Sequence, residues 1–230
     1  MTTNHHNQSN FIMNTQRLLA NTIDTILNHS YLDALDNNKI TKQKLELFVC
    51  EQYHIILNDK RNFALMISKT SDETAAKLFT TCLNTEFDAL ENLTLMAEEL
   101  GIDKTKIHDY EPLAGCQSYT NYLTKLAVYG LDAEILAAMM IDFPVWGANC
   151  GKMSNILKKN YGFSIKSCLF LDEFAFPIQQ QEAFVNECGK FIDSALPKYE
   201  KNMYTAARLL LDYELYFWDT IYQHSITTKE

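Results

Sequence analysis

The sequence predicts an all-α protein, a multi-helical bundle of seven to eight helices. The 230 residues include only seven Gly and four Pro, which is too few turn formers for a strand-rich fold. Hydrophobic residues make up 47% of the chain, enough to build a large core. Apolar residues recur at helical spacing, and no stretch alternates with a period of two for long enough to form a sheet.

The first half of the chain opens with a polar segment, residues 1–10, which we expect to be a flexible tail before a single helical domain at 11–225. Helices are expected over 11–28, 42–68 and 70–100, with a turn at 29–38. Thr41 is placed to be the N-cap of the second helix. Residues 70–73 (Thr-Ser-Asp-Glu) are typical of a capping box, and Gly101 is suited to follow the third helix as its C′ residue.

The second half contains the three prolines that affect the helix assignments most. Helices are expected over 118–129, from 130 to Pro144, over 153–161, 177–195 and 197–222. Pro144 should kink or end its helix because proline lacks the backbone N–H that a helical turn requires. Pro177 and Pro197 stand where proline can begin a helix. No element is assigned to the apolar stretch 163–176.

Charge and cysteine usage limit the classes of partner. The formal net charge is −9 without a Lys/Arg cluster, which argues against a nucleic-acid-binding surface. No apolar run reaches the length of a membrane span. The six cysteines are scattered without a CxxC pair, and we identify no signal peptide, so we expect reduced thiols in a cytoplasmic protein. The expected partner is a small molecule.

Two acids stand out because they interrupt apolar helices. Residues 135–141 are apolar nearly all round, as in a helix at the centre of a bundle, and Asp142 ends this run. Glu214 lies within the almost wholly apolar stretch 209–218. A buried carboxylate costs free energy unless it is paired or hydrogen-bonded. Each acid is therefore either a satisfied structural group or part of a site.

Four stretches together resemble a known family: residues 29–32 with 48–63, 117–120, 130–142, and 213–219. The last contains the sequence Glu-x-x-Phe-Trp-Asp. The chain resembles the TenA (thiaminase II) family, in the wider group that includes PqqC and the heme-oxygenase-like helical bundles. The resemblance implies a heme-oxygenase-like fold and, as in other family members, assembly as a homodimer or homotetramer. It implies activity less directly, because function depends on the site and not on the fold.

The resemblance assigns six positions to the family's pocket. These positions are Gln52, Ile55, Tyr119, Asp142, Phe174 and Glu214. Tyr119 and Glu214 match family residues, whereas Asp142 stands where the family has a nucleophilic Cys. Gln52 replaces the Asp that holds an aminopyrimidine, Ile55 its neighbouring Tyr, and Phe174 a Tyr from a loop. A carboxylate does not readily replace a thiolate as nucleophile, but it is suited to accept protons or hydrogen bonds.

The resemblance thus implies a buried pocket for a small nitrogen heterocycle or amine, such as a thiamine-related aminopyrimidine. Catalytic Asp142 and Glu214 would supply acid/base chemistry, and Gln52, Tyr119, Phe174 and Ile55 would bind the substrate. An enzyme of this kind would hydrolyse C–N bonds without a cofactor, and would not be a Cys-dependent thiaminase.

Two alternatives remain open: a PqqC-like cofactorless or iron-dependent oxidase, and a non-catalytic ligand-binding or interaction protein. Glu51 and His54 have the i, i+3 spacing of metal ligands in helical bundles, but the other helices offer no His at ligand spacing. We therefore expect no metal site. Residues 53, 54 and 58–61 are expected on the outer, solvated side of their helix.

Overall fold

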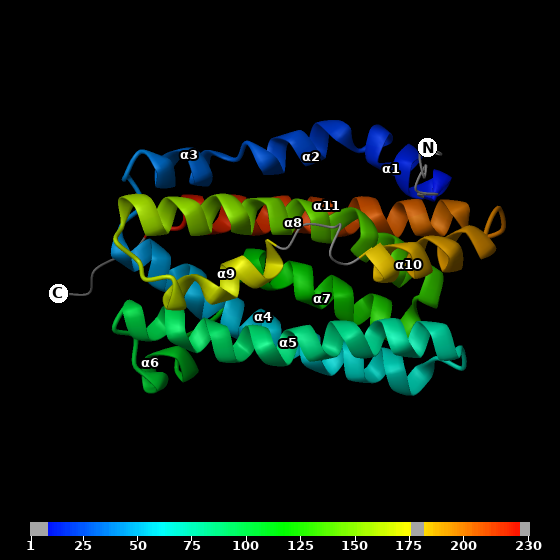
Figure 1. The fold of residues 1–230 in the computed structure, drawn as a ribbon, viewed down its shortest axis with the longest axis horizontal. Helices are drawn as coiled ribbons and strands as arrows, with labels where there is room; N and C mark the ends of the chain where they lie inside the picture. The colour runs from blue at the N-terminus through cyan, green and yellow to red at the C-terminus, as the bar shows by residue number, and fades with distance from the viewer. Residues whose placement is uncertain (1–8, 176–181, 226–230) are drawn as a thin grey trace, which may run out of the picture.

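The computed structural model describes residues 9–175 and 182–225, and these form an elongated bundle of helices (Figure 1). The described ranges contain no strand. The all-α prediction is therefore confirmed, although these ranges contain more helices than the seven to eight predicted. One predicted helix is divided in two, and short helices at 30–36, 104–108 and 169–174 lie where none was predicted. No helix in these ranges is long and apolar enough to cross a membrane.

The elements are α1 (Asn10–Leu18), α2 (Ala20–Leu27), α3 (Ser30–Asp36), α4 (Lys42–Lys69), α5 (Glu73–Glu99), α6 (Lys104–His108), α7 (Ala114–Tyr129), α8 (Asp132–Asn160), η1 (Lys166–Cys168), α9 (Leu169–Phe174), α10 (Glu182–Ser194) and α11 (Glu200–Gln223). Long helices α4, α5, α7, α8 and α11 pack against one another and form the body of the bundle. The short helices α1–α3 run along one side, against α8 and α11 (Figure 1).

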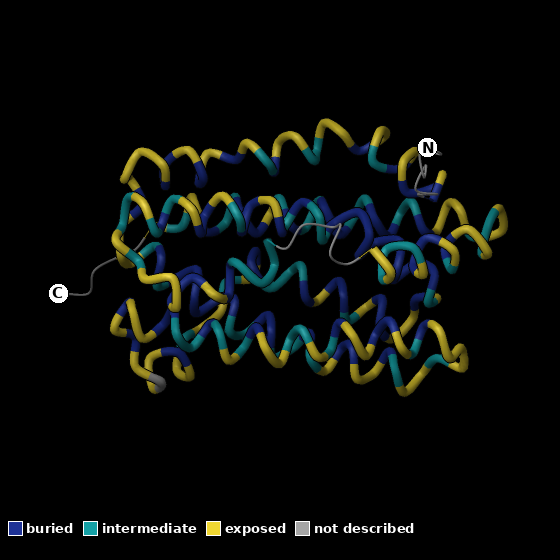
Figure 2. Tube along the Cα trace, viewed as in Figure 1, coloured by how far each residue is buried: buried dark blue, intermediate teal, exposed yellow. Residues whose placement is uncertain are grey.

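Helix α8 lies at the centre of the fold. Every residue from 133 to 142 is buried, because this stretch packs against helices on several sides. Figure 2 shows the buried positions between the helices and the exposed ones along the outer edges of the bundle. Of the two predicted effects of Pro144, a kink or an end of the helix, the end is wrong, since α8 continues through it to Asn160. Proline removes one helical hydrogen bond, and packing on both sides of the proline maintains the helix.

The first predicted helix is interrupted. Leu19 (φ −98°, ψ 9°) separates α1 from α2, and the predicted turn at 29–38 contains α3. The Nδ1 atom of His29 accepts a hydrogen bond from the backbone N–H of Tyr31 at 3.1 Å and caps α3. Tyr31 and Leu35 are fully buried. Tertiary packing thus stabilises a helix that is too short to be evident from periodicity.

The folded part of the chain begins two residues earlier than predicted, with Ser9 as the N-cap of α1 and Asn10 as its first residue. Ser9 and Asn10, placed in the tail by the sequence, belong to the folded part. Ser9 is buried, accepts a hydrogen bond from the N–H of Ile12 and donates one to Asp193 at 2.6 Å. Residues 1–8, the rest of the predicted tail, lie outside the described residues.

Two of the three predicted end signals in the first half are confirmed. Thr41 caps α4, and Gly101 (φ +67°) follows α5 in the left-handed conformation that glycine adopts without strain. The capping box at residues 70–73 is wrong. Asp72 is the N-cap of α5 and accepts from the N–H of Ala75 at 2.9 Å, while Glu73 pairs with Lys77. Asp72 stands directly before the first helical residue, and aspartate is a strong N-cap residue, so it caps the helix in place of Thr70.

The second half differs from the prediction mainly at helix starts. Helix α7 begins at Ala114, four residues before the predicted start, and the unassigned stretch forms η1 and α9. Helix α11 begins at Glu200, three residues after the predicted start at Pro197, which lies in the preceding turn. The predicted helix start at Pro177 lies outside the described residues.

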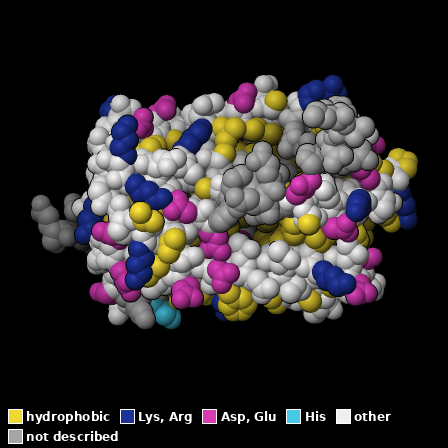
Figure 3. Space-filling view, in the orientation of Figure 1, with side chains coloured by type: hydrophobic (Ala, Val, Ile, Leu, Met, Phe, Trp, Pro, Cys, Tyr) yellow, Lys and Arg dark blue, Asp and Glu magenta, His cyan; other side chains and the backbone are white. Residues whose placement is uncertain are grey.

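On the face shown in Figure 3, Lys and Arg side chains are interspersed among Asp and Glu side chains. No continuous basic patch is seen on the described part of that face.

A lysine at each end of α4 holds the C-terminal end of a neighbouring helix. The Nζ of Lys44 donates to the carbonyl oxygens of Ile221, Tyr222 and His224 at 2.6–2.8 Å. At the other end, the Nζ of Lys69 donates to three carbonyls at the end of α7, at distances of 2.8–3.3 Å. Cations here satisfy carbonyls that lack a partner within the helix and interact favourably with the helix dipole.

We expect Lys44→Met to lower the free energy of unfolding by about 1–3 kcal/mol, because three carbonyls lose a charged donor. Urea denaturation followed by circular dichroism measures this change. Lys42→Met is the matched control, because Lys42 is exposed on the same helix and its loss should change stability by less than about 0.5 kcal/mol. Equal stability of the two variants would show that the lysine contacts do not stabilise the fold.

Candidate active site

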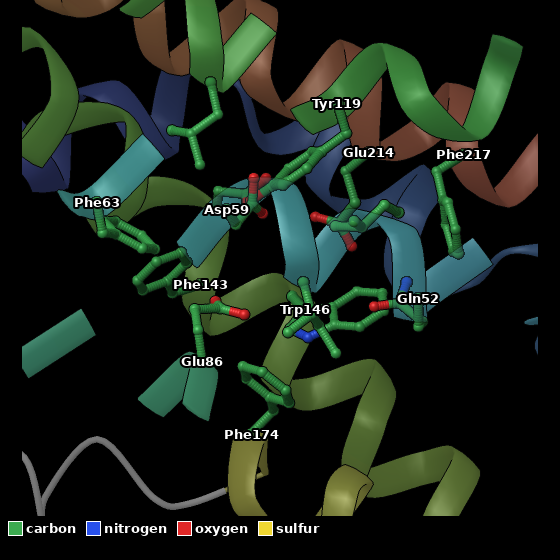
Figure 4. Close-up of a pocket in the computed structure, with 14 residues that line it drawn as sticks. Gln52, Asp59, Phe63, Glu86, Tyr119, Phe143, Trp146, Phe174, Glu214 and Phe217 are labelled. Carbon is green, nitrogen blue, oxygen red and sulfur yellow. The ribbon is translucent and has the colours of Figure 1, made fainter. Parts of the chain in front are cut away.

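A pocket lies inside the bundle between α4, α5, α7, α8, α9 and α11 (Figure 4). It offers about 60 Å³ of space to the centres of water-sized molecules, several times the roughly 10–15 Å³ that one water requires. Its walls are largely aromatic: Phe63, Phe143, Trp146, Phe174 and Phe217. Four carboxyl groups also line it, and none of its described lining residues is Lys, Arg or His. The pocket is therefore apolar with an acidic lining.

All six residues assigned from the sequence line this one pocket: Gln52, Ile55, Tyr119, Asp142, Phe174 and Glu214. They come from five different helices, α4, α7, α8, α9 and α11. Gln52 and Ile55 both face inward from α4, where the i, i+3 spacing places them on the same face. The structure thus brings the predicted positions together in one pocket.

Asp142 and Glu214 form the most deeply buried polar group in the pocket. Asp142 is fully buried and accepts a hydrogen bond from the hydroxyl of Tyr119 at 2.7 Å. Glu214 is 2% exposed, and its Oε1 accepts from the indole N–H of Trp218 at 3.0 Å. Oδ1 of Asp142 and Oε2 of Glu214 are buried without a donor from any described residue outside the pair. The two acids also hydrogen-bond to each other, with Glu214 donating to Asp142.

Burial controls the protonation of this pair. It raises the pKa of Asp142 to about 7, although hydrogen bonds from Tyr119 and Glu214 act in the opposite direction. Burial, together with the charge of Asp142, raises the pKa of Glu214 well above its usual value. Burial also raises the pKa of Tyr119, so its hydroxyl stays protonated. Near neutral pH, the pair therefore holds a proton on Glu214 while Asp142 is partly ionised, an arrangement typical of acid/base sites.

A third acid in the pocket, Asp59, was missed by the sequence analysis. We placed it on the solvated side of its helix, and the structure shows that this is wrong: Asp59 is 4% exposed and lines the pocket. Its Oδ1 accepts hydrogen bonds from the Thr120 hydroxyl and from Asn62. Spacing could have revealed it, because Asp59 follows Gln52 by seven residues and precedes Phe63 by four, on the inward face.

The fourth acid, Glu86, comes from α5. Burial, together with the charges of Asp59 and Glu173, raises the pKa of its carboxyl well above the usual value. The pocket thus holds two acids from α8 and α11 and two more from α4 and α5.

Glu51 and His54, which have metal-ligand spacing, lie outside this pocket. Glu51 is fully buried and accepts hydrogen bonds from the Tyr110 hydroxyl, the Leu113 N–H and the Gln117 amide at 2.6–2.7 Å. It thereby fastens the connection before α7 to α4. In the described ranges, no group of three or more His, Cys, Asp or Glu side chains could hold a metal ion.

Comparison with known proteins identifies the family. The sequence model of the TENA/THI-4/PQQC family matches residues 17–224. The chain belongs to this family. The resemblance found in the sequence is therefore confirmed.

Two relatives in the TENA/THI-4/PQQC family are similar to this chain. An aminopyrimidine aminohydrolase from Helicobacter pylori is 22% identical over 209 residues, covering 86% of this chain and 91% of that protein. An aminopyrimidine aminohydrolase from Halalkalibacterium halodurans is 28% identical over 117 residues. That second match covers 49% of this chain and spans about half, 51%, of the relative's length.

A solved structure from Shewanella denitrificans, a domain of unknown function with a heme oxygenase-like fold, superimposes with a TM-score of 0.78. The two share 15% identity, and the match covers 92% of both chains. The heme-oxygenase-like bundle predicted for this TENA/THI-4/PQQC protein is thus confirmed.

Cysteine does not contribute to the pocket of this TENA/THI-4/PQQC protein. All six cysteines are buried, and none of them lines it. Cys150 lies two turns beyond Asp142 on α8, and burial raises the pKa of its thiol well above the usual value. It is therefore inert as a nucleophile. The polar chemistry of the pocket belongs to carboxyl, hydroxyl and amide groups.

Proposed function

We propose that this protein binds a small amine-bearing heterocycle, of the thiamine-related aminopyrimidine class, and hydrolyses one of its C–N bonds. The observation that carries the proposal is the Asp142–Glu214 pair, two buried acids that hydrogen-bond to each other and line an aromatic pocket. The two relatives, both aminopyrimidine aminohydrolases, support the same substrate class. Buried polar groups that converge in a concave apolar pocket are typical of small-molecule sites.

The acid pair has the protonation states that hydrolysis requires. Ionised Asp142 accepts a proton from the attacking water as its oxygen bonds to carbon, and protonated Glu214 donates its proton to the leaving nitrogen as the C–N bond breaks. Tyr119 orients Asp142 through its hydrogen bond. A proton transfer from Asp142 to Glu214 then restores both groups. The reaction consumes one water and uses no cofactor.

The remaining pocket residues would hold the ring. Trp146 and Phe174, whose ring centroids lie 6.2 Å apart in an edge-to-face arrangement, provide flat apolar surfaces for it. Gln52 offers an amide that donates and accepts, and so can pair with a ring nitrogen beside an amino group. Because this amide is neutral, the charge that binds the amine comes from the buried acids. As part of the same proposal, the protein works in the cytoplasm as a homodimer or homotetramer.

The proposal is tested by incubating the purified protein with a panel of aminopyrimidines and thiamine fragments. We expect at least one member to raise the melting temperature, because a ligand that binds only the native state stabilises it. The same compound should release ammonia or an amine, measured by a coupled assay. Absence of any melting shift across the whole panel would contradict the proposal.

A further inference from the structure

Thr120 is a buried residue of α7 on which hydrogen bonds from α4 converge. It is 1% exposed, and its hydroxyl donates to Oδ1 of Asp59 and accepts from the amide of Asn58 at 2.9 Å. The amide of Asn62 donates to the backbone carbonyl of Thr120 at 3.4 Å and to the same Oδ1 of Asp59 at 3.1 Å. Three side chains of α4 thus hold a single residue of α7.

Thr120 directly follows Tyr119, whose hydroxyl donates to Oδ2 of Asp142 at 2.7 Å. Successive residues of a helix point about 100° apart, so Thr120 faces α4 while Tyr119 reaches into the pocket (Figure 4). The Tyr119 hydroxyl stands at the end of a long side chain. A small rotation of α7 about its axis would therefore move it farther than a short hydrogen bond tolerates.

Two other contacts between α4 and α7 lie nearer the ends of α7. Glu51 accepts from the Gln117 amide in the first turn, and Lys69 donates to carbonyls at the other end. Apolar packing between helices is non-directional, whereas hydrogen bonds require a narrow range of distances and angles. The contacts of Thr120 therefore fix the rotation of α7 in its middle, beside Tyr119.

We propose that Thr120 is a positioning residue, whose hydrogen bonds to α4 fix the rotation of α7 and so hold the Tyr119 hydroxyl against Asp142. Thr120 itself does not line the pocket and touches no substrate. The inference rests on the proposed function, in which Tyr119 orients ionised Asp142 to accept a proton from water.

The protonation of Asp142 reports on this role with a definite sign. Burial raises the pKa of Asp142 to about 7, and the hydrogen bond from Tyr119 acts against that rise, so loss of this bond should raise the pKa further. A direct route through Asp59 would act in the opposite sense. The Thr120 hydroxyl counteracts the burial that raises the pKa of Asp59 to about 7, so without it Asp59 would stay neutral to higher pH and repel ionised Asp142 less. The titratable groups that share the pocket with Asp142 are Asp59, Glu86, Tyr119 and Glu214.

The test follows the titration of Asp142 by NMR in protein with isotope-labelled aspartate carboxyls. The signal of Asp142 is assigned by its absence from Asp142→Asn. This measurement needs no substrate, so it examines the positioning role independently of turnover.

The central variant is Thr120→Val, which removes the hydroxyl and keeps the shape of the side chain. Asn58 still donates to the Thr124 hydroxyl at 3.1 Å, and Asp59 still accepts from Asn62, so neither loses its last partner. Thr120→Ser restores the hydroxyl. Thr124→Val is the matched control, because it removes the other acceptor of Asn58 one turn further along α7.

We expect the titration midpoint of Asp142 to rise by about one pH unit in Thr120→Val, the order expected when a charged group loses a hydrogen bond. Thr120→Ser and Thr124→Val should titrate as the native protein does. Adding Thr120→Val to Tyr119→Phe should give no further rise, because the hydroxyl through which Thr120 acts is already absent. An unchanged or lower midpoint in Thr120→Val would overturn the positioning role.

A second variant covers the case in which Thr120→Val does not fold, as judged by circular dichroism. Asn58→Ala, at a half-buried position, removes the other hydrogen bond of the Thr120 hydroxyl and should also raise the midpoint. Absence of a rise in Asn58→Ala would then overturn the role.

The outcomes separate this role from the proposed function. If the midpoint rises as expected but no aminopyrimidine is hydrolysed, the positioning of Tyr119 by Thr120 stands and the proposed function is contradicted. If hydrolysis is found and Thr120→Val keeps both the native midpoint and the native kcat/KM, the positioning role is overturned and the proposed function stands.

Discussion

Asp142→Asn and Glu214→Gln are each expected to lower kcat/KM for C–N bond hydrolysis by about 100-fold or more. Each substitution removes one proton-transfer group while keeping the shape of the side chain, and general acid–base catalysis contributes roughly 10²–10⁴-fold. The assay is steady-state release of product from the substrate found in the panel. Glu200→Gln, an exposed acid at the start of α11, is the control and should retain activity within about twofold.

The pH profile adds a second readout for the same pair. The proposed reaction needs Asp142 ionised, and burial raises its pKa to about 7. Activity should therefore rise as the pH increases through about 7, and fall at higher pH where Glu214 loses its proton, since its pKa is also raised. Asp142→Asn should lose the rising limb. An unchanged rising limb in that variant would assign the titration to another group.

The free energy of unfolding distinguishes a functional acid from a structural one. The folded-state pKa of Asp142 is about 7 and lies above its unfolded value of about 3.9. Folding therefore takes up a proton between these values, and the free energy of unfolding falls as the pH rises from about 4 to about 7. Asp142→Asn should therefore be at least as stable as the native protein at pH 8. A loss of several kcal/mol would instead indicate a structural acid.

The same chemistry explains which pocket residues the sequence could reveal. Asp142 and Glu214 are conspicuous because a single acid stands out in an apolar helix. Asp59 is not, because Asn58, Lys60 and Arg61 surround it and make the local pattern appear solvated. Only its register relative to Gln52 places it inside.

The helix boundaries show a similar limit. Local signals correctly placed the cap at Thr41 and the glycine at Gly101, where a single side chain or a left-handed backbone decides the outcome. They failed at Pro144, where packing around α8 outweighs the loss of one hydrogen bond. They also failed to indicate α3, which depends on burial of Tyr31 against α11. Where tertiary contacts determine whether a helix forms or where it ends, sequence periodicity alone does not predict it.

Gly147→Ala is expected to lower the free energy of unfolding by about 2–3 kcal/mol and to weaken binding of every pocket ligand at least about tenfold. A Cβ at position 147 would overlap the backbone carbonyl oxygen of Phe174, so α9 would have to move away from α8. Phe174 and Trp146 lie edge to face in the pocket wall. Displacement of α9 would therefore open the wall on which a ring stacks.

The matched control is Gly151→Ala, one turn further along the same helix. Its Cβ would lie 3.3 Å from the methyl group of Ala175, a contact that a small adjustment relieves. Both substitutions gain the same helix propensity, roughly 1 kcal/mol, so the difference between the variants in urea denaturation isolates the cost of the overlap with α9. Equal stability and equal ligand affinity of the two variants would show that the approach of α9 to Gly147 does not fix the pocket. Because Gly147→Ala changes the wall and leaves the acids in place, it should raise Kd for every pocket ligand, whereas the acid substitutions act on proton transfer.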